Sequence, residues 1–186
     1  MSHYEHTRRR VVRKAATAVL VAAPLMSGGA YLYAQSSSDF LPQITIVEIM
    51  DSMVMPAAQV VWDAVAYDVT AAGETITGPK TDEDWQRLRF SAIELAESAN
   101  NLVVPGRLVN HPGAVPGEGE LPPEKIQQLI DANRGAWVAH THVLYEAAMQ
   151  AVRAIDAKNA VQVSDAGGTI DTACEGCHLQ FWYPEQ

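Results

Sequence analysis

The chain has 186 residues, of which 48% are hydrophobic and 19% are charged, with 22 acidic residues against 13 basic ones and a net charge of −9. This length allows one domain with a sizeable core together with a leader segment. Binding to nucleic acid or to an anionic membrane surface needs clustered positive charge, so the acidic balance argues against both.

The first 34 residues have the pattern of an export signal. Residues 6–14 form a basic region, residues 15–34 are apolar, and small-residue cleavage sites follow Ala30 and Ala34. The apolar segment is also about long enough to stay in place as a membrane anchor, although its proline and glycines weaken a spanning helix. We favour a cleaved signal peptide over an anchor in the inner membrane. Both place the folded part of the chain outside the cytoplasm, in the periplasm.

After a polar spacer at residues 35–42, four long segments have helical periodicity, and none keeps the alternation of a strand for long. The first covers about residues 43–69, and Pro56 should kink or break it. The second covers about residues 82–103, and Thr81 is a good N-cap for it. The expected core-facing residues of the first segment are Ile46, Met50, Met53, Ala57, Val60 and Ala64.

The third segment covers about residues 122–157, and the fourth about residues 158–182. Gly167 and Gly168 interrupt the fourth, either as a break in the helix or as room for a flat cofactor to approach the backbone. Short or moderate connections favour an all-α fold, an antiparallel up-down-up-down four-helix bundle. The expected inward row of the third segment is Ile126, Ile130, Asn133, Trp137, His140, Leu144, Ala147, Ala151 and Ile155.

Residues 174–178 read Cys-Glu-Gly-Cys-His and contain the only cysteines of the chain. C-x-x-C-H is the attachment pattern of a c-type haem. Residues three and four apart share a helix face, so Cys174 and Cys177 can bond to the vinyl groups of one haem while His178 binds its iron. The alternatives are a disulfide, a zinc half-site and a thioredoxin-type pair. Zinc lacks further cysteine ligands, and a thioredoxin-type pair belongs early in the chain beside a βαβ unit, so we expect one covalent haem c.

Antiparallel helices place the start of the first segment beside the end of the fourth. At a helix rise of ~1.5 Å per residue, Met50 lies roughly 10 Å from that end and His178 roughly 6 Å from it. Met50 is therefore the expected distal ligand of the iron, opposite the proximal ligand His178. Met53 is the alternative, and Met55, which precedes the proline, should point elsewhere. The other interpretation is that these methionines only fill gaps in the core.

The remaining histidines are weaker candidates. His140 would lie roughly 25 Å from the haem end at the same rise per residue, and His142 is off the inward face. His111 belongs to the long loop of residues 104–121, which the topology places at the haem end. Arg107 is in the same loop. Two roles are open for it: pairing with a haem propionate, or balancing the charge at a helix C-terminus. No catalytic triad, phosphate loop or metalloprotease motif occurs, so the sequence does not predict an enzyme.

A CxxCH motif on the last helix of an all-α chain resembles the class II c-type cytochromes, the cytochrome c′ group. Residues 46–62 and the stretch NLVVPGR at residues 101–107 look like the methionine-ligated, low-spin branch of that group. The resemblance covers roughly residues 43–183. The chain departs from many relatives in lacking a basic residue among residues 181–183 and an arginine in the first helix. The site residues that the resemblance implies are the haem thioethers Cys174 and Cys177, the proximal ligand His178 and the distal ligand Met50.

The sequence thus predicts an exported monohaem c-type cytochrome that acts as a one-electron carrier. Without the first 34 residues, eight basic residues remain against 21 acidic ones, so the expected redox partners present a basic docking patch. Two alternatives stay open: a five-coordinate haem protein that binds a gas such as NO or CO, and a membrane-anchored accessory redox subunit. A homodimer is also compatible with the resemblance.

Overall fold

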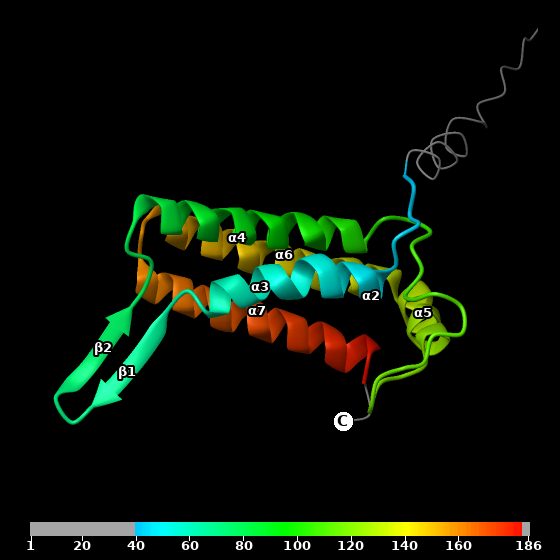
Figure 1. Cartoon of the computed structure of the whole chain (residues 1–186). Coiled ribbons are helices and arrows are strands. Elements are labelled where there is room, and N and C mark those ends of the chain that lie inside the picture. The colour runs from blue at the N-terminus through cyan, green and yellow to red at the C-terminus, as the bar shows by residue number, and fades with distance from the viewer. Residues whose placement is uncertain (1–39, 184–186) are drawn as a thin grey trace, which may run out of the picture. The chain divides into compact units, whose positions relative to one another are not determined.

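The computed structural model describes residues 40–183 (Figure 1). The expected leader at residues 1–34 and most of the spacer at residues 35–42 lie outside this range. The described residues are predominantly helical and include a two-stranded sheet. No helix among them combines the length and the apolar character needed to cross a membrane. In chain order, the elements are α2 (Ile46–Ile49), the π-helix η1 (Met50–Val54), α3 (Met55–Trp62), β1 (Ala66–Thr70), β2 (Gly73–Thr77), α4 (Asp82–Leu102), α5 (Pro123–Ala132), α6 (Arg134–Asp156) and α7 (Ala160–Phe181).

The long helices lie side by side around one apolar core (Figure 1). α4 packs along α6, α6 packs along α7, and α3 contacts both α4 and α7. The shorter helix α5 packs against α6 and α7, at the end of these helices opposite the hairpin of β1 and β2. The largest fully buried side chains are those of Trp137, Phe181, Ile46, Leu95, Ile126, Ile130 and Ile170.

Two helices begin with reciprocal capping boxes. The N–H of Asp84 donates to Oγ1 of Thr81 at 3.1 Å, and the N–H of Thr81 donates to Oδ2 of Asp84 at 3.0 Å. This satisfies two N–H groups that the first turn of α4 leaves free, and α4 begins at the position that the sequence predicts. Thr45 and Glu48 form the same box before α2. Hydrogen bonds from Thr45, with a smaller contribution from His111, lower the pKa of Glu48 to about 2.

The elements α2, η1 and α3 form one continuous helix at residues 46–62, which we call the first helix. The N–H of Met55 donates to the carbonyl oxygen of Met50, five residues back, and Pro56 follows in the first turn of α3. Proline has no N–H and clashes with the carbonyl four residues before it, and the wider π-helical turn accommodates this. The turn shifts the inward face by one residue. Val61 is therefore buried and Val60, expected to face the core, is 43% exposed.

The segment after α3 is a hairpin rather than the end of a helix. The first predicted segment, expected to reach residue 69, ends at Trp62, and β1 pairs antiparallel with β2. Tyr67 lies opposite Ile76, and both strands contain threonine together with β-branched or aromatic residues that favour extended backbone. Gly73 has φ +127°, a conformation that L side chains rarely adopt, so the turn favours glycine there. The all-α prediction is therefore corrected to a helical protein with a small sheet.

The third predicted segment is two helices, not one. α5 ends at Ala132 and α6 begins at Arg134, with Asn133 between them at φ −126° and ψ 39°. The side-chain amide of Asn133 donates to the carbonyl oxygen of Leu129 at 3.0 Å, and asparagine competes in this way with the helical backbone. The prediction of a continuous helix over residues 122–157 is wrong, and Asn133, expected to face inward, is exposed.

Candidate haem-binding site

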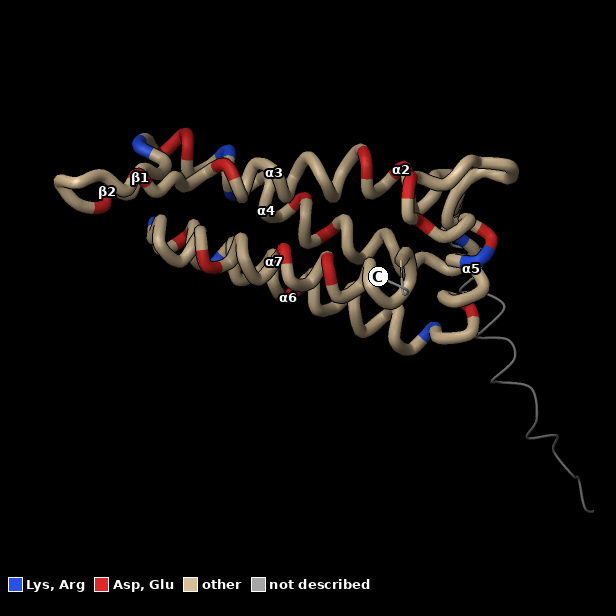
Figure 2. The backbone as a smooth tube through the Cα atoms, turned by 90° about the horizontal axis from the view of Figure 1, so that it is seen from below, with Lys and Arg blue, Asp and Glu red and all other residues tan. Residues whose placement is uncertain are grey.

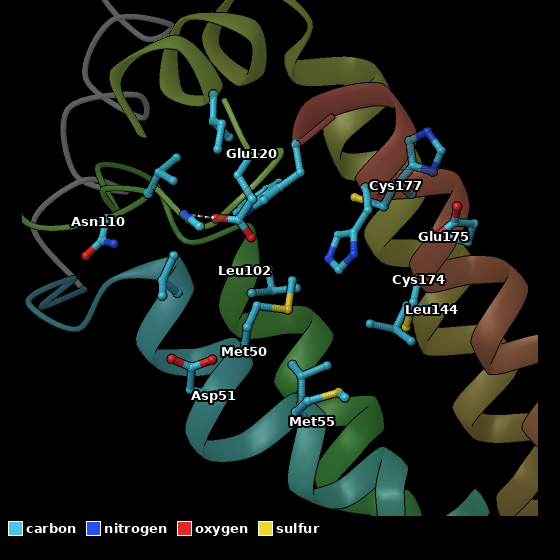
Figure 3. A pocket seen from close by; sticks show the side chains of 18 of the residues that line it. Met50, Asp51, Met55, Leu102, Asn110, Glu120, Leu144, Cys174, Glu175 and Cys177 are labelled. Atoms are coloured by element: carbon cyan, nitrogen blue, oxygen red, sulfur yellow. Dashed lines mark hydrogen bonds between the residues drawn. The ribbon is translucent and has the colours of Figure 1, made fainter. Parts of the chain in front are cut away.

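A cavity of about 600 Å³ opens between the first helix, α6, α7 and the loop that follows α4. Its volume is in the range of small-molecule and cofactor pockets. Figure 3 shows Met50, Leu102, Leu144 and Cys174 around it. The apolar part of the wall, which limits the access of water, includes Val47, Val54, Trp62, Leu102, Val109, Val115, Leu121, Ile126, Leu144, Ala173 and Trp182.

The CxxCH residues line this cavity from α7. Cys174, Cys177 and His178 are three and four residues apart on one helix, and all three belong to the cavity wall. Both cysteines are free thiols, and Cys177 is 8% exposed. Burial, assisted by the nearby charge of Asp171, raises the pKa of Cys174 to about 11, and burial raises that of Cys177 to about 12. Both side chains are therefore neutral thiols at neutral pH.

His178 is kept neutral by its surroundings. Burial lowers its pKa, against the opposing influence of Glu175 and Glu120. A neutral imidazole retains the lone pair that binds a metal. The ring lies against Trp182 and Tyr183, with centroid distances of 5.7 and 5.8 Å. The hydroxyl of Tyr183 donates to Oε2 of Glu175 at 3.2 Å, which holds Tyr183, just after α7, against that helix.

Two methionines of the first helix also line the cavity. Met50, the expected distal ligand, is one of them, and Met55 is the other (Figure 3). Met55 was expected to point elsewhere, but the π-helical turn brings it to the side of the helix that carries Met50. Met53, the alternative ligand, is half-buried against the core and is not part of the cavity wall.

His140 lies in the cavity wall, in contrast to the expected separation from the haem end. The expected distance assumed a helix that starts at Pro122, whereas α6 starts anew at Arg134. Nε2 of His140 is 2.7 Å from Oε1 of Gln180, and its ring packs edge-on against Phe181 at 6.0 Å. The helix break at Asn133 accounts for this placement.

The other two histidines of the described residues, His111 and His142, are not part of the cavity wall. His142 is exposed on α6. Nε2 of His111, also exposed, is 3.3 Å from Oε1 of Glu48. This contact joins the loop after α4 to the N-terminal capping box of the first helix.

Arg107 makes backbone contacts outside the cavity wall. Its Nε donates to the carbonyl oxygen of Asn101 at 2.9 Å, and Nη1 donates to that of Ile44. Burial lowers the pKa of the guanidinium. Arg107 therefore connects the C-terminal end of α4 to the segment before α2, and the propionate contact expected for it stays a prediction.

The charged residues in the cavity wall are acidic. They are Asp51 on the first helix, Glu120 in the loop, and Asp171 and Glu175 on α7. Among the described residues of the wall there is no lysine or arginine. α7 carries three acidic residues and no lysine or arginine along its whole length (Figure 2). The negative charge of the chain thus extends to the rim of the cavity.

The indole of Trp62 lies against Gly167 of α7. Nε1 of Trp62 donates to the carbonyl oxygen of Gly167 at 3.0 Å, and a Cβ atom at Gly167 would lie 3.2 Å from Cδ1 of Trp62. α7 continues through Gly167 and Gly168 without a break. The helix break expected as one interpretation of this glycine pair is therefore wrong. The space at Gly167 is used by Trp62, itself part of the cavity wall.

This contact predicts different effects of alanine at the two glycines. Gly168→Ala is expected to raise the free energy of unfolding by about 0.5–1 kcal/mol, because alanine favours a helix over glycine. A Cβ atom there meets nothing within 4 Å. Gly167→Ala should stabilise the protein less than Gly168→Ala, or destabilise it, because its methyl group must displace Trp62. Urea unfolding followed by circular dichroism measures both, and equal stabilisation by the two substitutions would contradict the contact.

Comparisons with known proteins find no matching family model, no matching curated protein and no matching solved structure. Two neutral thiols and a neutral imidazole come from α7, two thioethers come from the first helix, and the imidazole of His140 comes from α6. Within the described residues, no group of three histidine, cysteine or acidic side chains is arranged to hold a metal ion. The donor set fits a haem, which brings its own four nitrogen ligands to the iron.

Proposed function

We propose that the chain is a monohaem c-type cytochrome of the class II type and that it carries single electrons. One observation supports this above all others: both cysteines and the histidine of the CxxCH motif share an apolar cavity with a methionine of the first helix. The packing of α3, α4, α6 and α7 supports the finer fold assignment, a four-helix bundle with antiparallel neighbours.

Each residue of the site has its own chemical task. Cys174 and Cys177 hold the haem covalently, because an S–H group adds across a vinyl double bond without an oxidant. His178 presents a neutral nitrogen as the proximal ligand, and Met50 presents a thioether as the distal one. The haem, when bound, supplies the one-electron chemistry of its iron. Histidine–methionine ligation and an apolar wall favour the reduced state and raise the reduction potential.

The charge at the rim suggests which partners the site serves. Carboxylates of Asp51, Glu120, Asp171 and Glu175 belong to the wall of the cavity where the haem would lie. A redox partner with a basic patch would be attracted to this rim, and the attraction would weaken as salt increases. The expected export places this encounter in the periplasm, with or without an N-terminal anchor.

The coordination state of the iron separates electron transfer from gas binding. The wild-type protein is expected to be six-coordinate and low-spin in both oxidation states, with the weak charge-transfer band of methionine–iron ligation in the ferric form. Replacing both methionines of the cavity, as Met50→Ala with Met55→Ala, should abolish the band, lower the potential and admit carbon monoxide. Absorption spectroscopy, redox titration and carbon monoxide binding measure these changes.

Met53→Ala is the matched control for this experiment. Met53 lies on the same helix but outside the cavity wall, so its replacement should leave the spectrum nearly intact. A five-coordinate, high-spin wild type would refute the electron carrier as stated. It would favour the alternative, because an open iron position in an apolar cavity suits a small neutral gas such as NO or CO.

A further inference from the structure

Two thioethers from the same helix reach one cavity because of the π-helical turn between them. In an α-helix of 3.6 residues per turn, residues five apart point in directions that differ by about 140°. The hydrogen bond from the N–H of Met55 to the carbonyl oxygen of Met50 closes a wider turn, which brings residues five apart toward the same side of the helix. Both side chains accordingly belong to the cavity wall (Figure 3). Met53 does not belong to it.

We propose that Met55 is a second iron ligand held in reserve: it takes the distal position when the thioether of Met50 is absent. This inference rests on the proposed haem site and goes beyond it, because it assigns a role to a residue that the sequence pattern excluded. The two side chains have the same soft, neutral donor atom, so an exchange between them preserves the type of coordination.

The surroundings of the two methionines differ, and this difference determines which of them is the first ligand of the iron. Met50 is half-buried and packs against the core, so its side chain is already confined. Met55 is 52% exposed at the cavity wall. A methionine side chain has three rotatable bonds and adapts to irregular space, so Met55 can turn inward when the space of Met50 is empty. Met50 is therefore the first ligand and Met55 the substitute.

Each of the two other imidazoles near the cavity has a contact through its Nε2 atom. Nε2 of His140 is 2.7 Å from Oε1 of Gln180, and His140 belongs to α6 rather than to the first helix. His111 pairs with Glu48 outside the wall. Among the described residues of the wall, the remaining uncharged soft donor on the first helix is Met55.

Single and double variants of the holoprotein test this proposal. Met50→Ala should stay six-coordinate and low-spin, with a shifted but present methionine charge-transfer band and slow binding of carbon monoxide. Met55→Ala should keep the wild-type spectrum. The double variant should lose the band, become five-coordinate in the ferrous form and bind carbon monoxide rapidly. Met50→Leu, which nearly conserves the side-chain volume without sulfur, repeats the test without creating a cavity.

The outcomes separate this inference from the proposed function. Haem content after denaturation and the wild-type spectrum test the haem site and its distal methionine before any substitution. If both are as expected but Met50→Ala already matches the double variant, the reserve role of Met55 is overturned and the proposed function stands. A loss of the band in Met55→Ala alone would also overturn it, since Met55 would then be the first ligand.

Discussion

Replacing both cysteines, as Cys174→Ala with Cys177→Ala, is expected to abolish covalent haem. Acid–acetone extraction or denaturation should remove all haem from the double variant and none from the wild type, provided that both are expressed with export and a haem-attachment system. Both thiols line the same cavity from one face of α7, so each can hold one vinyl group. A single variant should keep its haem through one thioether and show an absorption maximum displaced toward that of a haem with one free vinyl group.

The controls for this experiment distinguish a loss of haem attachment from a loss of folding and from a loss of iron ligation. His142→Ala changes an exposed residue outside the cavity wall and should leave the haem content unchanged. His178→Ala should retain some covalent haem through the cysteines but lose the low-spin spectrum, because the proximal ligand is gone. A fully folded wild type that carries no haem after export would refute the cytochrome proposal altogether.

The features that the sequence predicted well are those determined by local chemistry. α4 starts after Thr81 because a capping box needs only two side chains three residues apart, and it ends before the Pro105–Gly106 pair. The shared face of the CxxCH residues follows from helical geometry alone. The inward position of Met50 was predictable for the same reason, since Met50 is the first residue of the π-helical turn and directly follows the regular helix α2.

The features that the sequence did not predict depend on interruptions of regular structure. The π-helical turn moves Met55 into the cavity wall, and no periodicity of 3.6 residues reveals it. Asn133 ends one helix and starts another, which brings His140 to the cavity. The hairpin at residues 66–77 buries none of its residues, so the period that usually identifies a half-buried strand is absent.

Long-range contacts determine the roles of two further residues, Gly167 and Arg107. The role of Gly167 could not be chosen from the sequence because its neighbour, Trp62, is 105 residues away. Arg107 was correctly placed in the long loop, yet its guanidinium binds carbonyl oxygens of Asn101 and Ile44 that a sequence pattern does not identify. Sequence patterns thus assign residue types to an end of the fold, and tertiary packing decides which of them face the cavity.

Trp137→Ala is expected to be the most destabilising single substitution in the core, with a loss of about 3–5 kcal/mol in the free energy of unfolding. Trp137 is 0% exposed, and its Nε1 donates to the carbonyl oxygen of Leu102 at 3.1 Å. Its ring meets Phe181 edge-on at 5.3 Å and stacks on Trp182 at 6.3 Å. It therefore joins the C-terminal end of α4 to α6 and to the end of α7.

Trp137→Phe separates the contribution of packing to this loss of stability from the contribution of the hydrogen bond. Phenylalanine keeps much of the ring contact but leaves the buried carbonyl oxygen of Leu102 without its donor, which costs about 1–3 kcal/mol. Phe90→Ala is the matched control, because Phe90 is 58% exposed and its loss should change the stability by no more than about 0.5 kcal/mol. Urea unfolding of the holoproteins measures all three variants. An equally small effect of Trp137→Ala and Phe90→Ala would contradict this core arrangement.

Trp137→Ala should also change the haem spectrum. Trp182, on which Trp137 stacks, belongs to the cavity wall and lies 5.7 Å from the ring of His178. Its carbonyl oxygen accepts a hydrogen bond from the N–H of Leu121 at 2.9 Å, which holds the loop against the end of α7. Removing the indole of Trp137 frees Trp182 to move, so the wall beside the proximal histidine loosens. Trp137→Ala should therefore broaden the low-spin spectrum at temperatures where Phe90→Ala leaves it unchanged. An unaltered spectrum of Trp137→Ala would contradict this link between the core and the haem site.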